Sequence, residues 1–275
     1  MATCTYFNDK PVELLEQPLK VITMNVSGGK GNGDDSNVDE HVPLRRRQHI
    51  AYVIRENKPD ILLVQEFRWK GIKGKTWKDT PLPDRYVYTG NNEASIIYDS
   101  ERFDLKELAQ TKLQRPLDEL KRKGKVSQGF TPLPRSTIRL LEQNGSTFLE
   151  TFKILVVSWH GVHRASDTEK KIQFQYLQVY LKELSEREEA AVLLGGDFNI
   201  NIDLIRGFVS EDFSLSEYEP SERRKGKVID YFIVSPELFF ENVKYIKLKN
   251  VQNRELDHDP VWATVVKKES VDGSG

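Results

Sequence analysis

Short apolar runs that end in a polar residue constrain the fold of this chain more than any other feature. The clearest runs cover residues 20–25, 60–66, 152–158, 190–194 and 228–234. Runs of this length, apolar at consecutive positions and rich in β-branched residues, are typical of strands buried on both faces. We therefore expect a set of buried strands whose polar ends gather at one rim. Two further strands are predicted at 243–248 and 260–266, and a pair of neighbouring strands at 86–89 and 94–98.

Two segments have helical periodicity. Residues 43–57 begin with Pro43, which suits a first helical turn, and are followed by Lys58-Pro59, which stops a helix. Residues 168–187 place Leu177 and Leu184 on an apolar side that also includes Ile172. Between residues 111 and 141 the periodicity is lost and basic residues dominate, which predicts a mobile loop or insertion.

Composition limits the classes of protein that this chain can belong to. The 41 Lys and Arg residues nearly balance the 42 Asp and Glu residues, so no global positive field attracts nucleic acid, and any polyanion binding must be local. The single Cys4 excludes a disulfide-stapled scaffold and favours a reducing compartment. We find no apolar stretch long enough to span a membrane. The expectation is a soluble intracellular protein of the nucleus or cytoplasm, with one domain over residues 1–270 and a disordered tail or expression remnant at 271–275.

The polar residues at the strand ends share one kind of chemistry, since they are carboxylates, amides and imidazoles rather than thiols or serine-centred groups. They are Asn25, Glu66, His160, Asp197, Asn199, Asp230, Asp257 and His258. One polar strand end is uninformative by itself, because most strands finish in something polar. The set as a whole predicts a site in which oxygen and nitrogen ligands converge.

These strand ends form motifs in an order that resembles the endonuclease/exonuclease/phosphatase superfamily of metal-dependent phosphodiesterases, which includes deoxyribonuclease I. The motifs are VITMN25, ILLVQ65E66, VVSWH160, GGD197FN199, ID230YFIVS and LD257H258DPV, spread over residues 20–266. GGDFN together with the C-terminal DHxPV is specific, whereas a lone strand-Asn is weak. The resemblance implies an α/β fold, namely a four-layer α/β/β/α sandwich with two mostly antiparallel sheets packed face to face.

The resemblance also implies a metal site. Glu66 matches the family's hard oxygen ligand for Mg²⁺ or Mn²⁺, usually assisted by the strand amide, here Asn25. Asp257 matches the carboxylate that the family uses near the metal or at a second metal position. Asp259 departs from the usual pattern, and its role stays open.

The catalytic roles follow from the same resemblance. Asp197 matches the carboxylate that orients or deprotonates the attacking water, and Asn199 matches the amide that steadies the pentavalent phosphorus. His258 matches the histidine on the scissile phosphate, with Asp230 as its orienting carboxylate. His160 resembles the second histidine of the deoxyribonuclease and sphingomyelinase branches, which makes it the expected general acid. Glu93 is a candidate for orienting His160, although a solvated acidic loop residue is the simpler interpretation.

Basic residues near the rim are candidate phosphate contacts. Arg164 follows the His160 strand, and the cluster Arg223, Arg224, Lys225 and Lys227 precedes the Asp230 strand. Together with the basic segment of residues 112–139, they could track a nucleic-acid backbone. Charge runs are also common as purely solubilising features, so this alternative stays open.

The sequence therefore predicts a divalent-metal phosphodiesterase, most simply an endonuclease that hydrolyses DNA or RNA by in-line attack of water. Two alternatives remain. One is a phosphodiesterase or phosphatase acting on lipid or inositol phosphate head groups. The other is a catalytically silent member of the fold that only binds nucleic acid; no motif residue is lost, which weighs against it.

Overall fold

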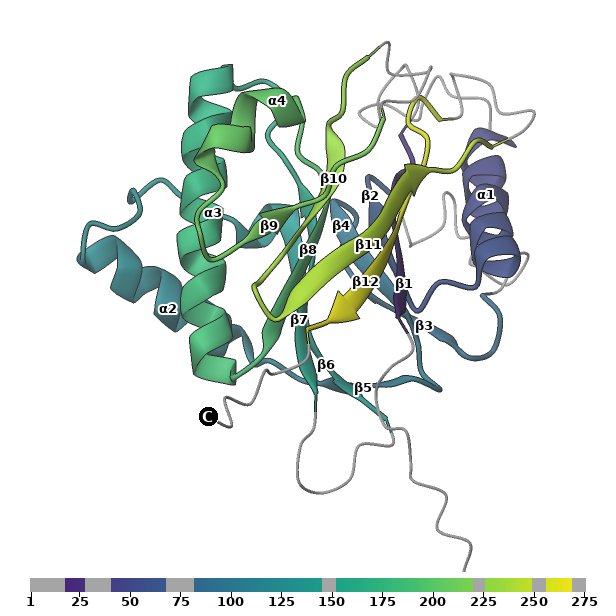
Figure 1. The fold of residues 1–275 in the computed structure, drawn as a ribbon, viewed down its shortest axis with the longest axis horizontal. Coiled ribbons are helices and arrows are strands. Elements are labelled where there is room, and N and C mark those ends of the chain that lie inside the picture. Colours follow the sequence, from purple (N-terminus) through teal and green to yellow (C-terminus); the bar gives the residue numbers. More distant parts are fainter. Residues whose placement is uncertain are drawn as a thin grey trace, which may run out of the picture.

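The computed structural model describes residues 18–27, 41–67, 82–144, 152–219, 226–248 and 256–268, without the side chains of residues 41–44. Two six-stranded sheets pack face to face (Figure 1). The first sheet has the order β11 (Leu238–Tyr245), β12 (Val261–Lys267), β1 (Leu19–Asn25), β2 (Ile61–Gln65), β4 (Ala94–Asp99) and β3 (Tyr86–Gly90). The second has the order β5 (Phe103–Lys106), β6 (Ser136–Gln143), β7 (Lys153–His160), β8 (Ala191–Asp197), β10 (Asp230–Val234) and β9 (Ser214–Leu215).

Each sheet is antiparallel except for one parallel pair at its centre. In the first sheet β1 runs parallel to β2, and in the second β7 runs parallel to β8. All four central strands are buried on both faces, which explains why they appear in the sequence as continuous apolar runs. The predicted pair at 86–89 and 94–98 is confirmed as β3 and β4, which are hydrogen-bonded to each other.

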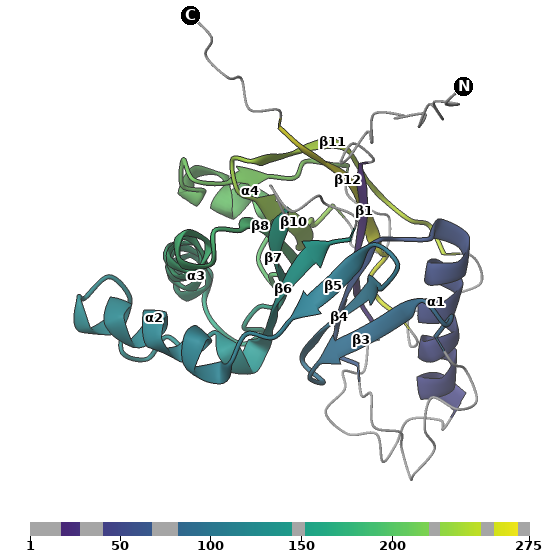
Figure 2. The same cartoon turned by 90° about the horizontal axis from the view of Figure 1, so that it is seen from below.

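Helices cover the outer faces of both sheets (Figure 2). Helix α1 (His41–Asn57) lies on the first sheet, while α2 (Gln110–Arg122), α3 (Asp167–Glu188) and the short α4 (Ile202–Ile205) lie on the second, with two 3-10 turns at η4 (Leu133–Arg135) and η5 (Arg206–Phe208). This arrangement confirms the predicted four-layer sandwich. Within the described residues no helix is long and apolar enough to cross a membrane.

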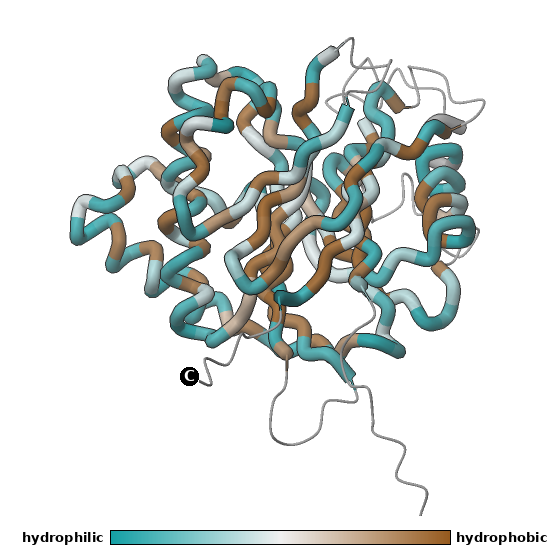
Figure 3. The backbone as a smooth tube through the Cα atoms, in the orientation of Figure 1, coloured by the Kyte–Doolittle hydropathy of each residue, from teal (hydrophilic) through white to brown (hydrophobic). Residues whose placement is uncertain are grey.

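Alternating side chains divide the core into three layers. Val21 and Leu63 point between the sheets, whereas Ile22 and Leu62 point toward α1. On the second sheet, residues such as Val157 pack toward α3. Figure 3 shows the apolar residues concentrated along the central strands, with hydrophilic residues on the outer sides of the helices. The two buried faces of each sheet fix its register, because a slip by one residue would exchange the two faces.

Helix α3 confirms the prediction for residues 168–187. Ser166 and Glu169 form a capping box, in which the Ser166 side chain accepts from the Glu169 N–H and the Glu169 carboxylate accepts from the Ser166 N–H. Such a box satisfies two N–H groups that have no partner within the helix. One residue was assigned to the wrong side: Ile172 is 40% exposed, and Phe174 and Leu181 are buried instead.

The predicted loop or insertion at residues 111–141 is wrong. The segment contains α2, a turn and the first part of β6, and α2 buries Leu113, Pro116, Leu117 and Leu120. These four residues recur at helical spacing, and the basic residues of α2 occupy the opposite, exposed side. The Tyr180 hydroxyl of α3 donates to the Leu113 carbonyl at 2.9 Å. Pro116 and the high charge hid the helical pattern, because proline inside a helix is normally unfavourable.

Three strands at the edges of the sheets were misplaced or missed. Strand β11 spans Leu238–Tyr245 instead of residues 243–248, and an irregularity between Phe240 and Asn242 shifts its register. Strands β5 and β9 were not predicted. Edge strands have one exposed side and are short here, so their apolar signal is weak.

Candidate active site

The topology brings the polar strand ends to one rim. The parallel strands β1 and β2 of the first sheet and β7 and β8 of the second finish at this rim, carrying Asn25, Glu66, His160 and Asp197. Strand β10 runs antiparallel to β8, so it starts where β8 ends, and Asp230 lies directly opposite Asp197. Strand β12 is likewise antiparallel to β1, which brings the segment before it, residues 256–260, to the same rim. Six strand ends therefore meet there, as predicted.

A first group of side chains joins the two sheets. Asn25 Nδ2 donates to Glu66 Oε1 at 3.1 Å and to Asp197 Oδ2 at 2.8 Å. His160 Nε2 lies 3.0 Å from the same Glu66 oxygen, and His160 Nδ1 lies 2.8 Å from Glu93 Oε2. Glu93 therefore contacts His160 as proposed from the sequence. The Asn25 amide faces two carboxylates with its NH₂ group, while its Oδ1 accepts from the Ser27 N–H at 2.8 Å.

A second group shares Asp197 with the first. His258 Nδ1 lies 2.6 Å from Asp230 Oδ2, which orients the imidazole so that Nε2 points toward Asp197 Oδ2 at 3.7 Å and Asp257 Oδ1 at 3.5 Å. Asp197, Asp230 and His258 are all buried. Asp197 thus stands between two imidazoles, each held from behind by another carboxylate.

The backbone of the GGDFN segment allows Asp197 and Asn199 to approach other strands closely. A Cβ on Gly196, whose φ is 154°, would lie 1.9 Å from the Trp159 carbonyl oxygen, so only glycine fits beside β7. Asn199 has a φ of 54°, and its N–H donates to Asp197 Oδ1 at 2.8 Å. This contact is an Asx-type turn. Asn199 Nδ2 donates to the Gly161 carbonyl at 3.0 Å, which directs the amide toward the rim loop after β7.

Glu66 also occupies the left-handed region, with a φ of 55°. A glutamate there is uncommon, and such a conformation costs of order 1–3 kcal/mol unless the surroundings stabilise it. The surroundings include the Glu66 N–H, which donates to the Glu93 carbonyl at 3.1 Å. In this conformation the Glu66 carboxylate contacts Asn25 Nδ2 and His160 Nε2.

The electrostatics of the site follow from burial and from these contacts. Burial acts to raise the pKa of Glu66, but the adjacent His160 and the Asn25 amide outweigh it and lower the pKa to about 2. Burial acts to lower the pKa of His160, but Glu66, Asp197 and Glu93 raise it overall. Burial and the neighbouring Asp230 raise the pKa of Asp197 against the opposing effect of His258. The site therefore pairs an ionised glutamate with a readily protonated histidine and a carboxylate of increased basicity.

The donor atoms fit a bound cation. Two sets of three side chains converge closely enough to hold a metal ion: Glu66, His160 and Asp197, and Asp197, Asp230 and His258. Among the described residues, two buried polar atoms at the site also lack a hydrogen-bond partner, namely Asp230 Oδ1 and Asp257 Oδ1. Orphaned buried polar atoms are rare in folded proteins and indicate a missing ligand or water. Carboxylate oxygens and imidazole nitrogens are common ligands of divalent cations.

The structure differs in detail from the predicted metal ligands. Asp257 is outside both sets of converging donors, and Asp259 is buried beside the site. Asn25 presents a donor rather than an acceptor to the carboxylates. Its NH₂ group therefore stabilises the two carboxylates by hydrogen bonding.

Only part of the predicted substrate-binding surface is described. Arg164 is exposed in the loop between β7 and α3, beside His163, whose Nδ1 lies 3.3 Å from Asn199 Oδ1. Lys227 is exposed and lies three residues before Asp230. Arg223, Arg224 and Lys225 lie outside the described residues.

Two contacts that stabilise the site were not predicted from the sequence. Gln65 is fully buried and joins the two sheets, because its Nε2 donates to Ser158 Oγ at 3.0 Å and its Oε1 accepts from Thr23 Oγ1 at 3.2 Å. Arg135 donates to the Gly161 carbonyl at 3.1 Å and so anchors the loop after His160. A polar residue at position 65 within the apolar run is a weak signal for the first contact. We find no sequence signal for the second.

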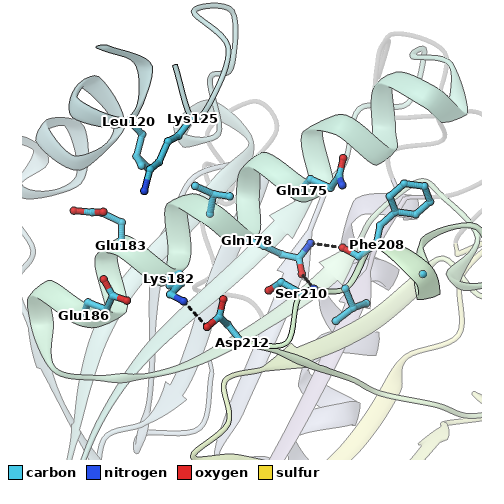
Figure 4. A pocket seen from close by; sticks show the side chains of 13 residues that line it. Leu120, Lys125, Gln175, Gln178, Lys182, Glu183, Glu186, Phe208, Ser210 and Asp212 are labelled. Carbon is cyan, nitrogen blue, oxygen red and sulfur yellow. Dashed lines mark hydrogen bonds and ion pairs between the residues drawn. The ribbon is translucent and has the colours of Figure 1, made fainter. Parts of the chain in front are cut away.

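A separate pocket of about 670 Å³ lies against α3, away from the rim (Figure 4). Within it, Lys182 pairs with Asp212, and the Gln178 amide donates to the Phe208 carbonyl and accepts from the Ser210 N–H. These contacts attach the segment after η5 to α3. We assign this pocket a structural role.

A sandwich of two facing sheets with carboxylates and imidazoles at one rim is typical of one class of metal-dependent hydrolases. The model of the Endonuclease/Exonuclease/phosphatase family matches residues 22–248. The chain belongs to this family. No curated protein matches the sequence significantly.

Solved structures share the fold at low sequence identity. An endonuclease/exonuclease/phosphatase family protein from Bacteroides thetaiotaomicron has a TM-score of 0.65 and 21% identity, covering 92% of this chain and 97% of that chain. The mannosyl-6-phosphatase of the same organism has a TM-score of 0.64 and 19% identity, covering 90% and 99%. TDP2 of D. rerio, complexed with a single-strand DNA product, has a TM-score of 0.56 and 13% identity, covering 91% and 99%.

Proposed function

We propose that this protein is a divalent-metal-dependent phosphodiesterase that hydrolyses DNA or RNA. The observation that best supports this proposal is the position of Asp197. Its Oδ2 accepts a hydrogen bond from Asn25 Nδ2 and lies 3.7 Å from His258 Nε2. One carboxylate thus contacts a candidate metal-binding group on one side and a candidate phosphate-binding group on the other. The nuclease assignment is supported by the solved TDP2 complex with a DNA product, which shares this fold.

The residues at the rim would have different roles in the reaction. Glu66 and Asp197 would hold Mg²⁺ or Mn²⁺, the Asn25 amide would position both carboxylates by donating to them, and Asp257 would lie near the cation. When bound, the cation supplies Lewis-acid stabilisation of the negative charge that develops on the phosphate. Asp197, whose pKa is raised by burial and by Asp230, orients the attacking water and accepts its proton.

The two imidazoles serve opposite ends of the reacting phosphate. Asp230 holds His258 with Nε2 directed into the site, where its N–H donates to a phosphate oxygen. His160, whose pKa is raised by its carboxylate neighbours despite burial, donates a proton to the leaving oxygen. Asn199 donates an amide N–H to an oxygen on the pentavalent phosphorus, and Arg164 and the basic cluster with Lys227 bind the flanking phosphates.

A second candidate is a phosphatase acting on a sugar, lipid or inositol phosphate. It is favoured by the fold shared with a mannosyl-6-phosphatase, because the same residues can stabilise a phosphomonoester transition state. The substrates of the two candidate enzymes differ in the groups that flank the phosphate. Rim residues other than the proposed catalytic residues would bind these groups.

One assay separates the candidates. The purified protein is incubated with Mg²⁺ and with plasmid DNA, single-stranded DNA, RNA, sphingomyelin, inositol phosphates or mannose 6-phosphate. We expect cleavage of at least one nucleic acid, and its loss in Asp197→Asn. Cleavage of only the small phosphates would replace the nuclease by the phosphatase. Retardation of DNA on a gel without cleavage of any substrate would support the catalytically silent alternative.

A further inference from the structure

The turn between β3 and β4, residues 90–94, contacts both halves of the active site. Its Glu93 uses two different groups: the carbonyl oxygen accepts from the Glu66 N–H at 3.1 Å, and the side-chain Oε2 lies 2.8 Å from His160 Nδ1. Glu66 belongs to the first sheet and His160 to the second. The turn therefore determines how a candidate metal ligand and a candidate general acid are placed relative to one another.

Packing does not hold the Glu93 side chain in place. This side chain is 51% exposed, whereas the His160 side chain it contacts is 8% exposed. A half-exposed glutamate loses rotamer freedom when it is held in one conformation. Its contact with His160 therefore depends on a backbone that is fixed in advance.

Asn91 supplies that fixed backbone. Its Oδ1 accepts from the Glu93 N–H at 2.8 Å and from the Ala94 N–H at 2.9 Å, and its own N–H donates to the Ala94 carbonyl at 3.0 Å. An asparagine that accepts from N–H groups two and three positions further on closes the chain into an Asx turn. The same side chain donates through Nδ2 to the Ser136 carbonyl of β6 at 3.4 Å, which reaches the opposite sheet.

Two further contacts fix the turn against β6. Thr137 Oγ1 donates to the Ala94 carbonyl at 2.6 Å. Gly90 has a φ of 129°, and a Cβ there would lie 2.7 Å from both Ser95 Cα and Thr137 Oγ1, so the backbone approaches as closely as glycine permits. The turn thus has a defined position on the second sheet, which carries His160.

From these contacts we propose that Asn91 is a positioning residue of the active site, acting through Glu93 on His160 and on the Glu66 backbone. The hydrogen bonds of the Asn91 side chain described above are with Glu93, Ala94 and Ser136, so its effect on His160 and Glu66 is indirect. The inference rests on the proposed function in one respect, since the effect on turnover assumes that His160 takes part in phosphodiester cleavage. The geometric effect on His160 does not depend on that assumption.

Nuclear magnetic resonance of the metal-free protein tests the geometric effect. The downfield proton of His160 Nδ1–H is assigned by its absence in His160→Gln and reports donation to Glu93. We expect it in the wild type and in Asn91→Asp, which retains the acceptor oxygen. We expect its loss in Asn91→Ala and in Asn91→Gln, which keeps the amide but displaces it by one methylene. Absence from the folded wild type, or persistence in both of the last two variants, would overturn the proposal.

Kinetics with bis(p-nitrophenyl) phosphate and Mg²⁺ test the effect on turnover. Loss of an outer residue that orients a site ligand typically costs about 10- to 100-fold, so kcat of Asn91→Ala should fall by roughly that factor. KM should stay within about twofold, because Asn91 does not bind substrate. Asn91→Asp should recover most of kcat. Equal kcat in wild type and Asn91→Ala would overturn the proposal, whereas an inactive wild type with the expected resonances would overturn the proposed function and leave the positioning contact confirmed.

Discussion

The Asn25 amide nitrogen, at the end of β1, lies 2.8 Å from Asp197 Oδ2, at the end of β8 in the opposite sheet. The two residues are 172 positions apart in the chain, and both side chains are buried. This hydrogen bond joins the two sheets at the rim, and the same amide nitrogen also donates to Glu66 Oε1 at 3.1 Å. The integrity of the candidate site therefore depends on how the sheets are held together.

Removal of the charge at Asp197 should abolish turnover without unfolding the protein. In Asp197→Asn the Asn25 contact can be retained by the new amide, but a proton acceptor is lost. General base catalysis contributes about 10²- to 10⁴-fold, so kcat should fall by at least that range. Circular dichroism and the thermal midpoint serve as the control for folding. Activity comparable to the wild type would show that the base lies elsewhere.

His258→Ala should have an effect on turnover of similar size. Asp230 acts through this imidazole, to which it is bonded at 2.6 Å. The double variant His258→Ala/Asp230→Asn should therefore lose little more activity than His258→Ala alone. Additive losses, measured as kcat/KM on the same substrate, would show that Asp230 has an independent role.

The contact between Glu66 and His160 should make the stability of the metal-free protein depend on pH. The pKa of Glu66 is lowered from 4.5 to about 2, so its contribution is complete above about 4.5 and is lost as the pH falls through about 2. The pKa of His160 is raised from 6.5, so its contribution is present below 6.5 and is lost as the pH rises through the higher folded value.

Urea unfolding of wild type and Glu66→Gln checks this dependence in the presence of a chelator. The free energy of unfolding of the wild type should exceed that of Glu66→Gln between the two ordinary pKa values, and the difference should shrink at acid pH. A difference that is constant from about pH 2 to about pH 6 would contradict the assignment of the charged pair.

Gln65→Met should destabilise the fold. The substitution leaves the hydroxyls of Ser158 and Thr23 without the partners they have at 3.0 and 3.2 Å. Unsatisfied buried polar groups cost about 1–3 kcal/mol each, so the free energy of unfolding should fall by at least about 1 kcal/mol. Gln175→Met, at an exposed position of α3, is the matched control and should change it by less than about 0.5 kcal/mol. Equal effects at the two positions would show that the buried network is not stabilising.

Replacement of Arg164 and Lys227 by alanine should flatten the salt dependence of nucleic-acid binding. Each phosphate contact contributes roughly 0.9 to the slope of log K against log salt for duplex DNA, so the double variant should lower the slope by about 2 if both residues bind phosphates. Lys182→Ala, paired with Asp212 on α3 away from the rim, should leave the slope unchanged. An unchanged slope in the double variant would exclude these residues from the interface.

The sequence by itself determined the central strands, helix α3 and the polar residues that end the strands. Strands buried on both faces need consecutive apolar residues, and this requirement is visible without knowledge of the partners. The order of the motifs was enough to predict the family and the two facing sheets. All the strand-end residues from Asn25 to His258 lie at one rim as predicted.

Only the tertiary structure decided which of these groups touch. Helix α2 was missed because its stability comes from packing on α3, which local charge and Pro116 conceal. The contact of Glu93 with His160 joins residues 67 positions apart, and the role of Asn91 appears only once its turn is placed against β6. Such contacts depend on the distance between two sheets, and this distance is set by the packing of many buried side chains rather than by any local pattern.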